Sequence, residues 1–458
     1  MENYNLSVDE LLIIINGELK GNKDNSFNYF STDSRNISNT ELFIALSGEK
    51  FNGHNFIKDV ISKGVRGFIV QENIDLDNEE LTFIKVDNSL KAYQNIANYI
   101  RKKLNPFVIG ITGSSGKTST KEIAYSFFSQ FYNTFKSEAN YNNEIGVPLS
   151  LLNMSKNDKV AIIEMGMRGK GQIQELAEIA EPNAGIITGI GTAHIELLGS
   201  VEEIADAKWE LAENLLKTNS YLSIPIYDKH LVRLSSNYPK DKLLTIDLEK
   251  NENASFYLIN SWIENDKQYF SYFDNITKKE HNASLSVYGK HQISNALLVI
   301  SLSKVLNIEL PDFIDLSFEN LSGRTETFKI DTSTIVNDSY NANPESMKAA
   351  IETFLDLYKN KENILVIGEM RELGDKSLFY HQEIGNFLNN FNFKELLVIN
   401  KNAEEIYKTY KNKNSIFFED NKSAGNYLKK YLSEGVNIFF KASRGAKLEE
   451  VIEVLREK

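Results

Sequence analysis

The sequence predicts an α/β protein of three domains: a small N-terminal α/β domain, a central parallel-sheet domain with added antiparallel strands, and a C-terminal doubly wound domain. Length is the first indication, because 458 residues exceed what one hydrophobic core usually organises. The second is that short apolar runs of strand type alternate with helical patterns. The third is a change of pattern at two positions, from which we place the domains at 1–104, 105–322 and 323–458.

The N-terminal domain mixes short strands with helices. Apolar runs at 42–46 and 67–70 are typical of buried strands, and a polar helix closes the domain with a basic last turn at 101–103. Asn105-Pro106 follows. We interpret this pair as a linker, because the residue before a proline is disfavoured in a helix.

In the central domain, apolar runs lead into glycine-rich turns and then helices, which is typical of parallel strands joined by crossover helices. Residues 254–288 are instead rich in Tyr, Phe, Ser and Asn and alternate in polarity. This alternation predicts antiparallel strands added to the domain.

The C-terminal domain shows a regular alternation of strands and helices. Strands are expected at 335–336, 364–367, 396–399 and 438–440, and helices from Pro344 and from about Ser377. The alternation predicts a doubly wound, Rossmann-like parallel sheet. Ligands of such sheets bind beyond the carboxyl ends of the strands.

Composition excludes several classes of function. A formal charge of -12 gives no reason to expect nucleic acid or anionic lipid as a partner. The chain has no Cys, which excludes disulfide scaffolds and thiolate chemistry. The N-terminus lacks a secretory signal pattern, and apolar runs such as 11–15 are far shorter than a membrane span. We therefore expect a cytoplasmic protein without membrane insertion.

A glycine-rich loop follows the first strand of the central domain and precedes a helix. Loop and helix start comprise Gly113, Ser114, Ser115, Gly116, Lys117, Thr118 and Ser119. In that context, backbone N–H groups and the helix N-terminus bind phosphate, Lys117 adds a charge, and Thr118 offers a hydroxyl to Mg²⁺. The spacing is a variant, because Ile111 stands five residues before Gly116. The loop predicts a nucleotide site without indicating the reaction; the alternative is a Gly/Ser turn with an exposed lysine.

Two further polar residues follow strands of the same sheet. Glu164 ends the apolar run at 160–163, where a nucleotide-hydrolysing enzyme holds its metal-side acid. The alternative is a solvated glutamate at a strand end. His194 follows the run at 185–188 and a glycine-rich turn, so we expect it at the same edge of the sheet.

Lys208 lies within the apolar stripe of a predicted helix that includes Ile204 and Leu211. An unpaired ammonium in such a stripe is unfavourable, so it needs a carboxylate partner or a change of chemistry. Sequence neighbours that could pair with it are Glu203, Asp206 and Glu210. On the residues alone, a salt bridge is the favoured interpretation.

Several motifs accompany these residues in a fixed order. They are Asp33-Ser34-Arg35, Gly53-His54-Asn55-Phe56, Asn140-Tyr141-Asn142-Asn143-Glu144-Ile145-Gly146, Glu164-Met165-Gly166, Ala207-Lys208, Gly289-Lys290-His291-Gln292-Ile293-Ser294-Asn295-Ala296, Gly323-Arg324 and Asp338-Ser339-Tyr340-Asn341-Ala342-Asn343-Pro344. Together they resemble the Mur ligase superfamily over essentially the whole chain. The last motif points to the branch that adds D-alanyl-D-alanine to UDP-N-acetylmuramoyl tripeptide (UDP-MurNAc-tripeptide) in peptidoglycan synthesis.

The resemblance implies a role for each matched residue. The N-terminal domain would hold the UDP end of the substrate, the central domain ATP and metal, and the C-terminal domain would close over both. Lys117 and Arg324 would contact the transferring phosphate. The other implied roles are Asn295 for adenine, Asp338 for ribose, Thr118 and Glu164 for one Mg²⁺, His194 for a second, a carbamate on Lys208 that faces the metals, and Ser34, Arg35, Asn140 and Asn142 for the UDP-linked substrate.

By the same resemblance, the tripeptide carboxylate would take the γ-phosphoryl group of ATP to form an acyl phosphate. The amine of D-alanyl-D-alanine would then displace phosphate. For that dipeptide we expect a site in the C-terminal domain formed by Tyr340, Asn341, Asn343, Ser443 and Arg444, although Asn343 before Pro344 could instead cap a helix. We expect a monomer whose partners are these small molecules.

Two residues depart from the pattern of the family, and two other functions are open alternatives. Gln292 stands where the family more often has Asn, and Asn337 where an Asp is common; both changes are near-isosteric, so the adenosine geometry is only slightly affected. One rival is a superfamily ligase that adds another amino acid, or glutamate to folate. The other is a phosphotransferase or nucleotide-dependent switch that shares only the phosphate-binding loop.

Overall fold

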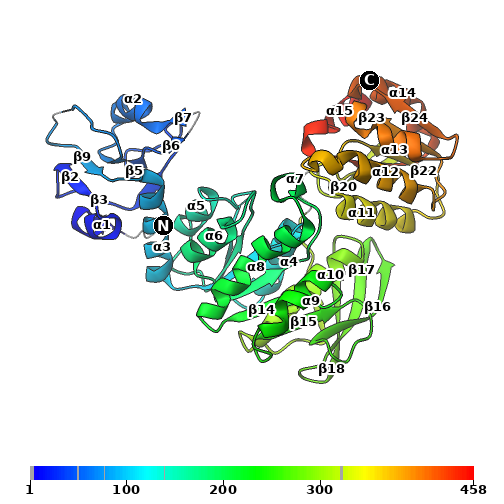
Figure 1. The fold of residues 1–458 in the computed structure, drawn as a ribbon, viewed down its shortest axis with the longest axis horizontal. Helices are drawn as coiled ribbons and strands as arrows, with labels where there is room; N and C mark the ends of the chain where they lie inside the picture. Colours follow the sequence, from blue (N-terminus) through cyan, green and yellow to red (C-terminus); the bar gives the residue numbers. More distant parts are fainter. Residues whose placement is uncertain (1–4, 49–50, 77, 139, 320–322, 458) are drawn as a thin grey trace.

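The computed structural model describes residues 5–48, 51–76, 78–138, 140–319 and 323–457. Three sheets form three successive regions of the chain, coloured blue, cyan to green, and yellow to red in Figure 1. The boundary that we predicted at residue 322 lies outside the described residues.

The N-terminal region is a five-stranded sheet with helices packed on it. Its order is β2-β9-β8-β5-β4, with β2 antiparallel to β9 and the other pairs parallel. The strands are β2 (Glu18–Gly21), β4 (Tyr29–Ser31), β5 (Glu41–Ile44), β8 (Gly67–Val70) and β9 (Thr82–Lys85); short pairs are β1 (Leu6–Ser7) with β3 (Ser26–Phe27), and β6 (Ser47–Gly48) with β7 (Phe51–Asn52); the helices are α1 (Val8–Ile15), α2 (Ile57–Ser62) and α3 (Ser89–Leu104).

Helix α3 joins the first region to the second. The Asn88 side chain caps its start by accepting a hydrogen bond from the Lys91 N–H at 3.0 Å, and the left-handed Asn105 ends it. The helix packs against α5 and α6 of the central region. Its buried Arg101 donates to the Ala180 carbonyl at 2.8 Å and to the Glu181 carbonyl at 2.7 Å. These contacts fix the two regions to each other.

The central region is one ten-stranded sheet of order β11-β12-β10-β13-β14-β15-β16-β17-β18-β19. Strands β11 to β16 run parallel, and β16, β17 and β18 pair antiparallel, so the prediction of added antiparallel strands is confirmed. The strands are β10 (Phe107–Thr112), β11 (Thr134–Lys136), β12 (Val160–Glu164), β13 (Ala184–Ile187), β14 (Tyr221–Pro225), β15 (Leu243–Asp247), β16 (Phe256–Glu264), β17 (Lys267–Asp274), β18 (Lys279–Leu285) and β19 (Phe313–Asp315).

Helices cover this sheet, as the predicted alternation of strands and crossover helices requires. They are α4 (Lys117–Phe128), α5 (Gly146–Leu152), α6 (Gln172–Ala180), α7 (Ile195–Leu198), α8 (Val201–Lys217), α9 (Lys229–Leu234) and α10 (Lys290–Ser301). Helices α4 and α10 pack together, as do α6 and α8. Fully buried Ile109 and Ile162 of the sheet belong to the apolar core that includes Phe127 of α4.

The C-terminal region has a six-stranded sheet of order β20-β21-β25-β22-β23-β24. Its strands are β20 (Glu326–Ile330), β21 (Ser333–Asn337), β22 (Asn363–Ile367), β23 (Glu395–Ile399), β24 (Ser415–Phe418) and β25 (Asn437–Lys441); its helices are α11 (Pro344–Leu357), α12 (Ser377–Leu388), α13 (Glu404–Thr409), α14 (Asn421–Leu428) and α15 (Glu449–Arg456). The predicted parallel sheet is present, with one difference. Edge strand β20 is antiparallel to β21, because only a tight turn with left-handed Asp331 joins them.

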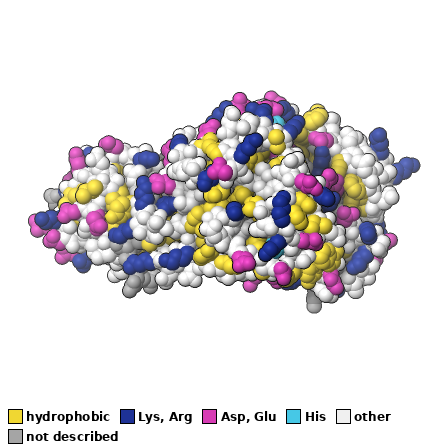
Figure 2. All heavy atoms as spheres, turned by 90° about the horizontal axis from the view of Figure 1, so that it is seen from below, with side chains coloured by type: hydrophobic (Ala, Val, Ile, Leu, Met, Phe, Trp, Pro, Cys, Tyr) yellow, Lys and Arg dark blue, Asp and Glu magenta, His cyan; other side chains and the backbone are white. Residues whose placement is uncertain are grey.

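The surface carries charges of both signs. On the face drawn in Figure 2, Lys and Arg side chains are interspersed with Asp and Glu. Among the described residues, no helix has the length and apolar character needed to cross a bilayer.

Candidate active site

A cleft of about 900 Å³ opens between the central and C-terminal regions. It is lined from one side by residues that follow β10, β12 and β13, and from the other by residues around β21 and the start of α11. These are carboxyl ends of parallel strands, where ligands of α/β sheets bind. The two sheets therefore share one site.

The glycine-rich loop between β10 and α4 needs its glycines. Gly113 has φ +151°, and a Cβ there would lie 1.9 Å from Thr188 Oγ1. Gly116 has φ +84° at the start of α4, and its Cβ would lie 3.0 Å from Asn295 Oδ1. Glycine is the residue that tolerates such backbone and such close approach. The loop thereby places the N-terminus of α4 at the cleft, where an anion is stabilised.

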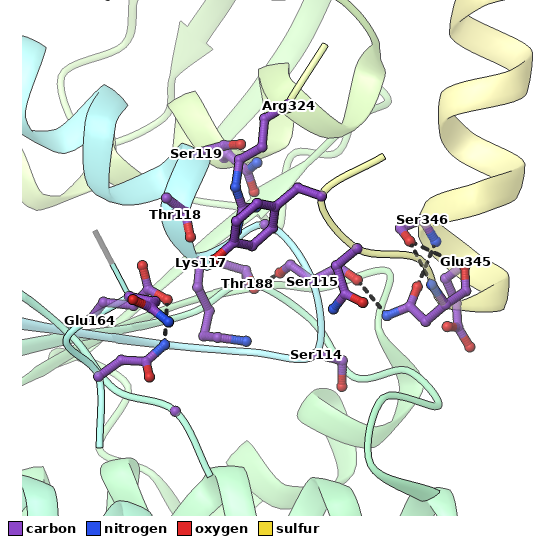
Figure 3. Close-up of a pocket in the computed structure, with 18 of the residues that line it drawn as sticks. Ser114, Ser115, Lys117, Thr118, Ser119, Glu164, Thr188, Arg324, Glu345 and Ser346 are labelled. Carbon is purple, nitrogen blue, oxygen red and sulfur yellow. Dashed lines mark hydrogen bonds between the residues drawn. The ribbon is translucent and has the colours of Figure 1, made fainter. Parts of the chain in front are cut away.

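Lys117 projects from the first turn of α4 into the cleft. Figure 3 shows it beside Thr118, with Glu164 and Ser114 on either side and Arg324 approaching from the C-terminal region. Its ammonium donates to the Gly113 carbonyl at 2.8 Å. Burial lowers the pKa of Lys117, and the nearby Glu164 carboxylate opposes that shift. The lysine contributes a positive charge to a cleft that also contains Arg324.

Glu164 is the last residue of β12 and is 2% exposed. Its Oε1 accepts a hydrogen bond from Asn142 Nδ2 at 2.8 Å, whereas Oε2 has no hydrogen-bond donor and lies 3.8 Å from Lys121 Nζ. The Lys121 ammonium partly offsets the charge, but a buried carboxylate oxygen without a hydrogen-bond donor stays unfavourable, and a solvated side chain would not be buried in this way. The interpretation of Glu164 as a solvated strand-end residue is therefore wrong.

The oxygen atoms available here suit a hard cation. Thr118 and Glu164 both line the cleft, and hydroxyl and carboxylate oxygens are the ligands that Mg²⁺ prefers. Among the described residues, no group of three or more His, Asp or Glu side chains is arranged to hold a metal.

His194 follows β13 in a left-handed conformation, with φ +69°. It lines the cleft, and its Nδ1 lies 2.6 Å from Glu372 Oε2 of the C-terminal region. The second-metal role of His194 stays a prediction, and in this arrangement the ring faces a carboxylate from the other domain.

Lys208 of α8 is 1% exposed. Its three candidate partners are engaged elsewhere: Glu203 pairs with Lys170, Asp206 with Arg233, and Glu210 accepts the Gly171 and Gln174 N–H groups. Within the described part of the chain, no ion pair or hydrogen bond reaches the Lys208 ammonium. Burial, and then the nearby Lys117 charge, lower its pKa well below the ordinary value. The salt-bridge interpretation is therefore wrong.

The residues predicted for adenosine and γ-phosphate all line the cleft. Asn295 of α10 lies against Gly116 of the phosphate loop. Asp338 follows β21, where its Oδ2 accepts from Lys441 Nζ at 2.7 Å. The Arg324 guanidinium lies 4.0 Å from the centroid of the Tyr340 ring, a cation–π contact. Part-buried His291 also lines this end, and burial lowers its pKa to about 4.

The residues predicted for the dipeptide are not all together. Tyr340, Asn341 and Asn343 line the cleft. Asn343 caps α11 through the Ser346 N–H at 2.8 Å and donates to Ser115 Oγ at 2.8 Å, so the capping interpretation is correct. Ser443 and Arg444 lie outside the cleft lining; Ser443 Oγ donates to the Ala342 carbonyl and accepts from the Arg371 N–H. Their contact with a substrate stays a prediction.

The residues predicted for the UDP-linked substrate lie in two places. Asn140 and Asn142 line the cleft, whereas Ser34 and Arg35 follow β4 in the N-terminal region. The Arg35 side chain donates to Asp33 Oδ1 at 2.8 Å and holds the pKa of Asp33 at about 2.

Sequence reasoning missed three charged residues at this site. Lys121 follows Lys117 by one helical turn and approaches Glu164, a relation that the i, i+4 spacing could have suggested. Lys441 ends β25 and pairs with Asp338, although nothing in the local pattern marks it. Glu345, just after Asn343-Pro344, accepts hydrogen bonds from Thr192 of the central region.

Three family models match successive parts of the chain. They are described as Mur ligase family, catalytic domain (residues 27–101), Mur ligase middle domain (111–303) and Mur ligase, glutamate ligase domain (323–444). The UDP-N-acetylmuramoyl-tripeptide--D-alanyl-D-alanine ligase of Bacillus subtilis is 34% identical over 447 residues, which cover 93% of this chain and 93% of that protein. This chain belongs to the Mur ligase family.

Solved structures of the Mur ligase family have the same fold. The crystal structure of MurF from Acinetobacter baumannii matches with a TM-score of 0.91 at 25% identity, covering 100% of both chains. MurF ligase from Thermotoga maritima, solved in complex with ADP, matches with a TM-score of 0.82 at 27% identity, covering 93% of this chain and 96% of that one. The predicted fold class, three α/β domains of a Mur ligase, is confirmed.

Proposed function

We propose that this member of the Mur ligase family joins D-alanyl-D-alanine to UDP-MurNAc-tripeptide, with conversion of ATP to ADP and phosphate. The product is the UDP-MurNAc-pentapeptide of peptidoglycan synthesis. The observation that carries the proposal is the shared cleft, in which a phosphate loop and Glu164 from one domain meet Arg324 and Asp338 from another. The substrates are those named for the relatives that match nearly the whole chain.

The first step must activate a carboxylate, which is a poor electrophile. Transfer of the γ-phosphoryl group to the tripeptide's terminal carboxylate gives an acyl phosphate and ADP. Negative charge spreads over the transferring group as the bond to ADP breaks. Lys117 from the central domain and Arg324 from the C-terminal domain offer cationic donors to that group from two directions.

The second step forms the amide. The free amine of D-alanyl-D-alanine attacks the acyl carbon, and phosphate leaves from the tetrahedral intermediate. Three substrates must lie in line, and holding them together lowers the barrier by avoiding their loss of free motion. We assign Tyr340 and Asn341, which line the C-terminal side of the cleft, to the dipeptide. Ser443 and Arg444 would contact the dipeptide only if the loop after β25 turned toward the cleft.

Mg²⁺ would be held by Thr118 and Glu164, with His194 as candidate ligand for a second ion. When bound, it would neutralise phosphate charge and orient the transferring group. The fit rests on the donor-free Oε2 atom of Glu164 and on its burial. Glu372 contacts the His194 ring at Nδ1, so Nε2 is the nitrogen that would ligate an ion.

Lys208 is the candidate for carbamylation. Its lowered pKa favours the neutral amine, which adds to CO₂ with release of a proton and becomes an anion. That anion would remove the repulsion with Lys117 and could face the metal site. A buried lysine without a partner is otherwise hard to explain. Cytoplasmic location and the monomeric state remain predictions.

The test is phosphate release from ATP with purified protein, UDP-MurNAc-tripeptide, D-alanyl-D-alanine and Mg²⁺, leaving out one component at a time. We expect release only with the full set, together with a pentapeptide product in the mass spectrum. Release with a single amino acid in place of the dipeptide would support a different ligase of the family. Turnover without any acceptor amine would support a phosphotransferase or a nucleotide switch.

A further inference from the structure

The C-terminal domain contacts the central domain through the first turn of α11. Glu345 lies in that turn, and its two carboxylate oxygens accept hydrogen bonds from the Thr192 N–H at 3.1 Å and the Thr192 hydroxyl at 3.0 Å. Thr192 belongs to the segment between β13 and α7, which also carries His194. One carboxylate thus holds a loop of the neighbouring domain at two points.

Gly191 makes this approach possible. A Cβ at Gly191 would lie 2.9 Å from Glu345 Cδ and 2.9 Å from Glu345 Oε2, and its nearest neighbours are all atoms of Glu345. The Gly191 N–H donates to Ser114 Oγ at 2.9 Å, and the Gly191 carbonyl accepts from the same hydroxyl at 3.2 Å. Ser114 is part of the phosphate loop. The contact therefore extends from Glu345 through two residues to the nucleotide site.

The same turn makes a second contact. Asn343 Nδ2 donates to Ser115 Oγ at 2.8 Å, so two neighbouring serines of the phosphate loop are tied, directly or through Gly191, to the start of α11. Figure 3 shows Glu345 and Ser346 beside Ser115 at this end of the cleft.

Glu345 has no role in the capping of its own helix. Asn343 and Ser346 form the capping box of α11. A glutamate in a first turn gains modestly from the helix dipole, but an exposed side chain would do the same without a partner. The two hydrogen bonds to Thr192 add an interdomain function to that position.

We infer that Glu345 is a positioning residue: by accepting both hydrogen bonds from Thr192, it sets the 191–194 segment and the phosphate loop for phosphoryl transfer only while the C-terminal domain is docked. The inference deepens the proposed function and rests on it. ATP binding to the central domain does not require the contact, whereas the rate of transfer does.

The first test is steady-state kinetics of Glu345→Ala and Glu345→Gln, with Glu352→Gln on an exposed part of the same helix as control. Glu345→Ala should lower kcat at least tenfold while the KM for ATP changes less than threefold, since loss of a charge-assisted pair removes roughly one to two powers of ten. Glu345→Gln keeps an acceptor oxygen and should recover part of the rate. The control should match the wild type. An unchanged kcat for Glu345→Ala overturns the inference.

The second test uses Gly191→Ala in two backgrounds. In the wild type the added methyl should displace the Glu345 carboxylate and lower kcat about as much as Glu345→Ala does. In the Glu345→Ala background the clash is gone, so Gly191→Ala should cost less than a further twofold. An equal loss in both backgrounds would mean that Gly191 acts on the phosphate loop directly, and would overturn the role of Glu345.

The third test is independent of turnover. Because the chain has no Cys, Lys250→Cys in the central domain and Lys411→Cys in the C-terminal domain give unique sites for a pair of spin labels. With Mg²⁺ and a non-hydrolysable ATP analogue, the distance distribution should be narrow in the parent and broader with Glu345→Ala. An identical distribution in both overturns the inference. If Glu345→Ala broadens the distribution relative to the parent, but the parent forms no pentapeptide, only the proposed function is contradicted.

Discussion

The two sides of the cleft differ in how well their polar groups are satisfied. On the central side, Glu164 Oε2 has no hydrogen-bond donor and Lys208 has no anionic partner among the described residues. On the C-terminal side, Asp338 pairs with Lys441 at 2.7 Å, and Arg324 packs on the Tyr340 ring. On the C-terminal side, protein side chains satisfy the charged groups. On the central side, Glu164 Oε2 lacks a hydrogen-bond donor and Lys208 lacks an anion.

This difference indicates where ligands bind most strongly. A buried carboxylate oxygen without a hydrogen-bond donor and a buried lysine without an anion are both unfavourable, and a ligand that completes them recovers free energy. The central side should therefore gain most from nucleotide and cation, whereas the C-terminal side supplies a preformed surface.

The largest effect is expected from Lys117→Ala. The lysine is the cation of the phosphate loop, so we expect kcat to fall about 10³-fold or more, as for loss of a main charge-stabilising donor. Coupled release of phosphate measures the change, and Lys250→Ala in the same domain is the control. A loss of less than tenfold would mean that Arg324 or a cation carries most of the charge stabilisation.

Lys208→Ala should come next. If a carbamate forms there, the variant should lose about 10²- to 10³-fold in rate, and added short carboxylates such as formate or acetate should restore part of it. A ¹³C NMR signal from protein equilibrated with ¹³CO₂, absent in the variant, would identify the adduct. Lys217→Ala on the exposed end of the same helix is the control. An active variant that small acids do not affect would remove the carbamate role.

Glu164→Gln should have a smaller effect, which Mg²⁺ should partly overcome. The amide keeps the volume and one acceptor oxygen but loses the charge that attracts the cation. We expect on the order of a hundredfold lower rate at limiting Mg²⁺, and recovery at high Mg²⁺. Titration of the ion at saturating substrates measures this. Identical Mg²⁺ dependence in variant and wild type would place the cation elsewhere.

The smallest effect concerns acid stability at the adenosine end. Burial lowers the pKa of His291 to about 4, so the folded state binds fewer protons than the unfolded state between pH 4 and 6.5. Stability is therefore lost as pH falls below about 6.5, by about 2 kcal/mol at pH 5. His291→Asn should remove that part of the drop in Tm between pH 7 and 5. His230→Asn should leave it in place, and an unchanged slope in His291→Asn would contradict the assignment.

The arrangement of each half-site could be predicted from sequence. Residues 107–111 and 160–163 carry no polar side chain, which predicts two buried parallel strands and places Lys117 and Glu164 at the same edge of the sheet. The helix start at Pro344 could be predicted for a similar reason, because Asn343 and Pro344 suit the first positions of a helix.

The pairing between distant segments could not be predicted. Lys441 meets Asp338 because β25 inserts between β21 and β22, and strand order is not written in the local pattern. Glu345 meets Thr192 across 153 positions of sequence and a domain boundary. For Lys208, the local carboxylates suggested a salt bridge, but its side chain is buried in the core while those carboxylates bind partners at the surface.

Helix α3 fixes the distance between the N-terminal and central regions. Because Arg101 and its neighbours lock this helix onto the central region, the sheet that would hold the uridine carrier stands at a set spacing from Lys117. If the peptide of the carrier were one residue shorter, its terminal carboxylate would fall roughly 3.5 Å short of the position where phosphoryl transfer takes place. If that sheet holds the carrier, the fixed spacing of the two regions would limit which peptide lengths reach Lys117.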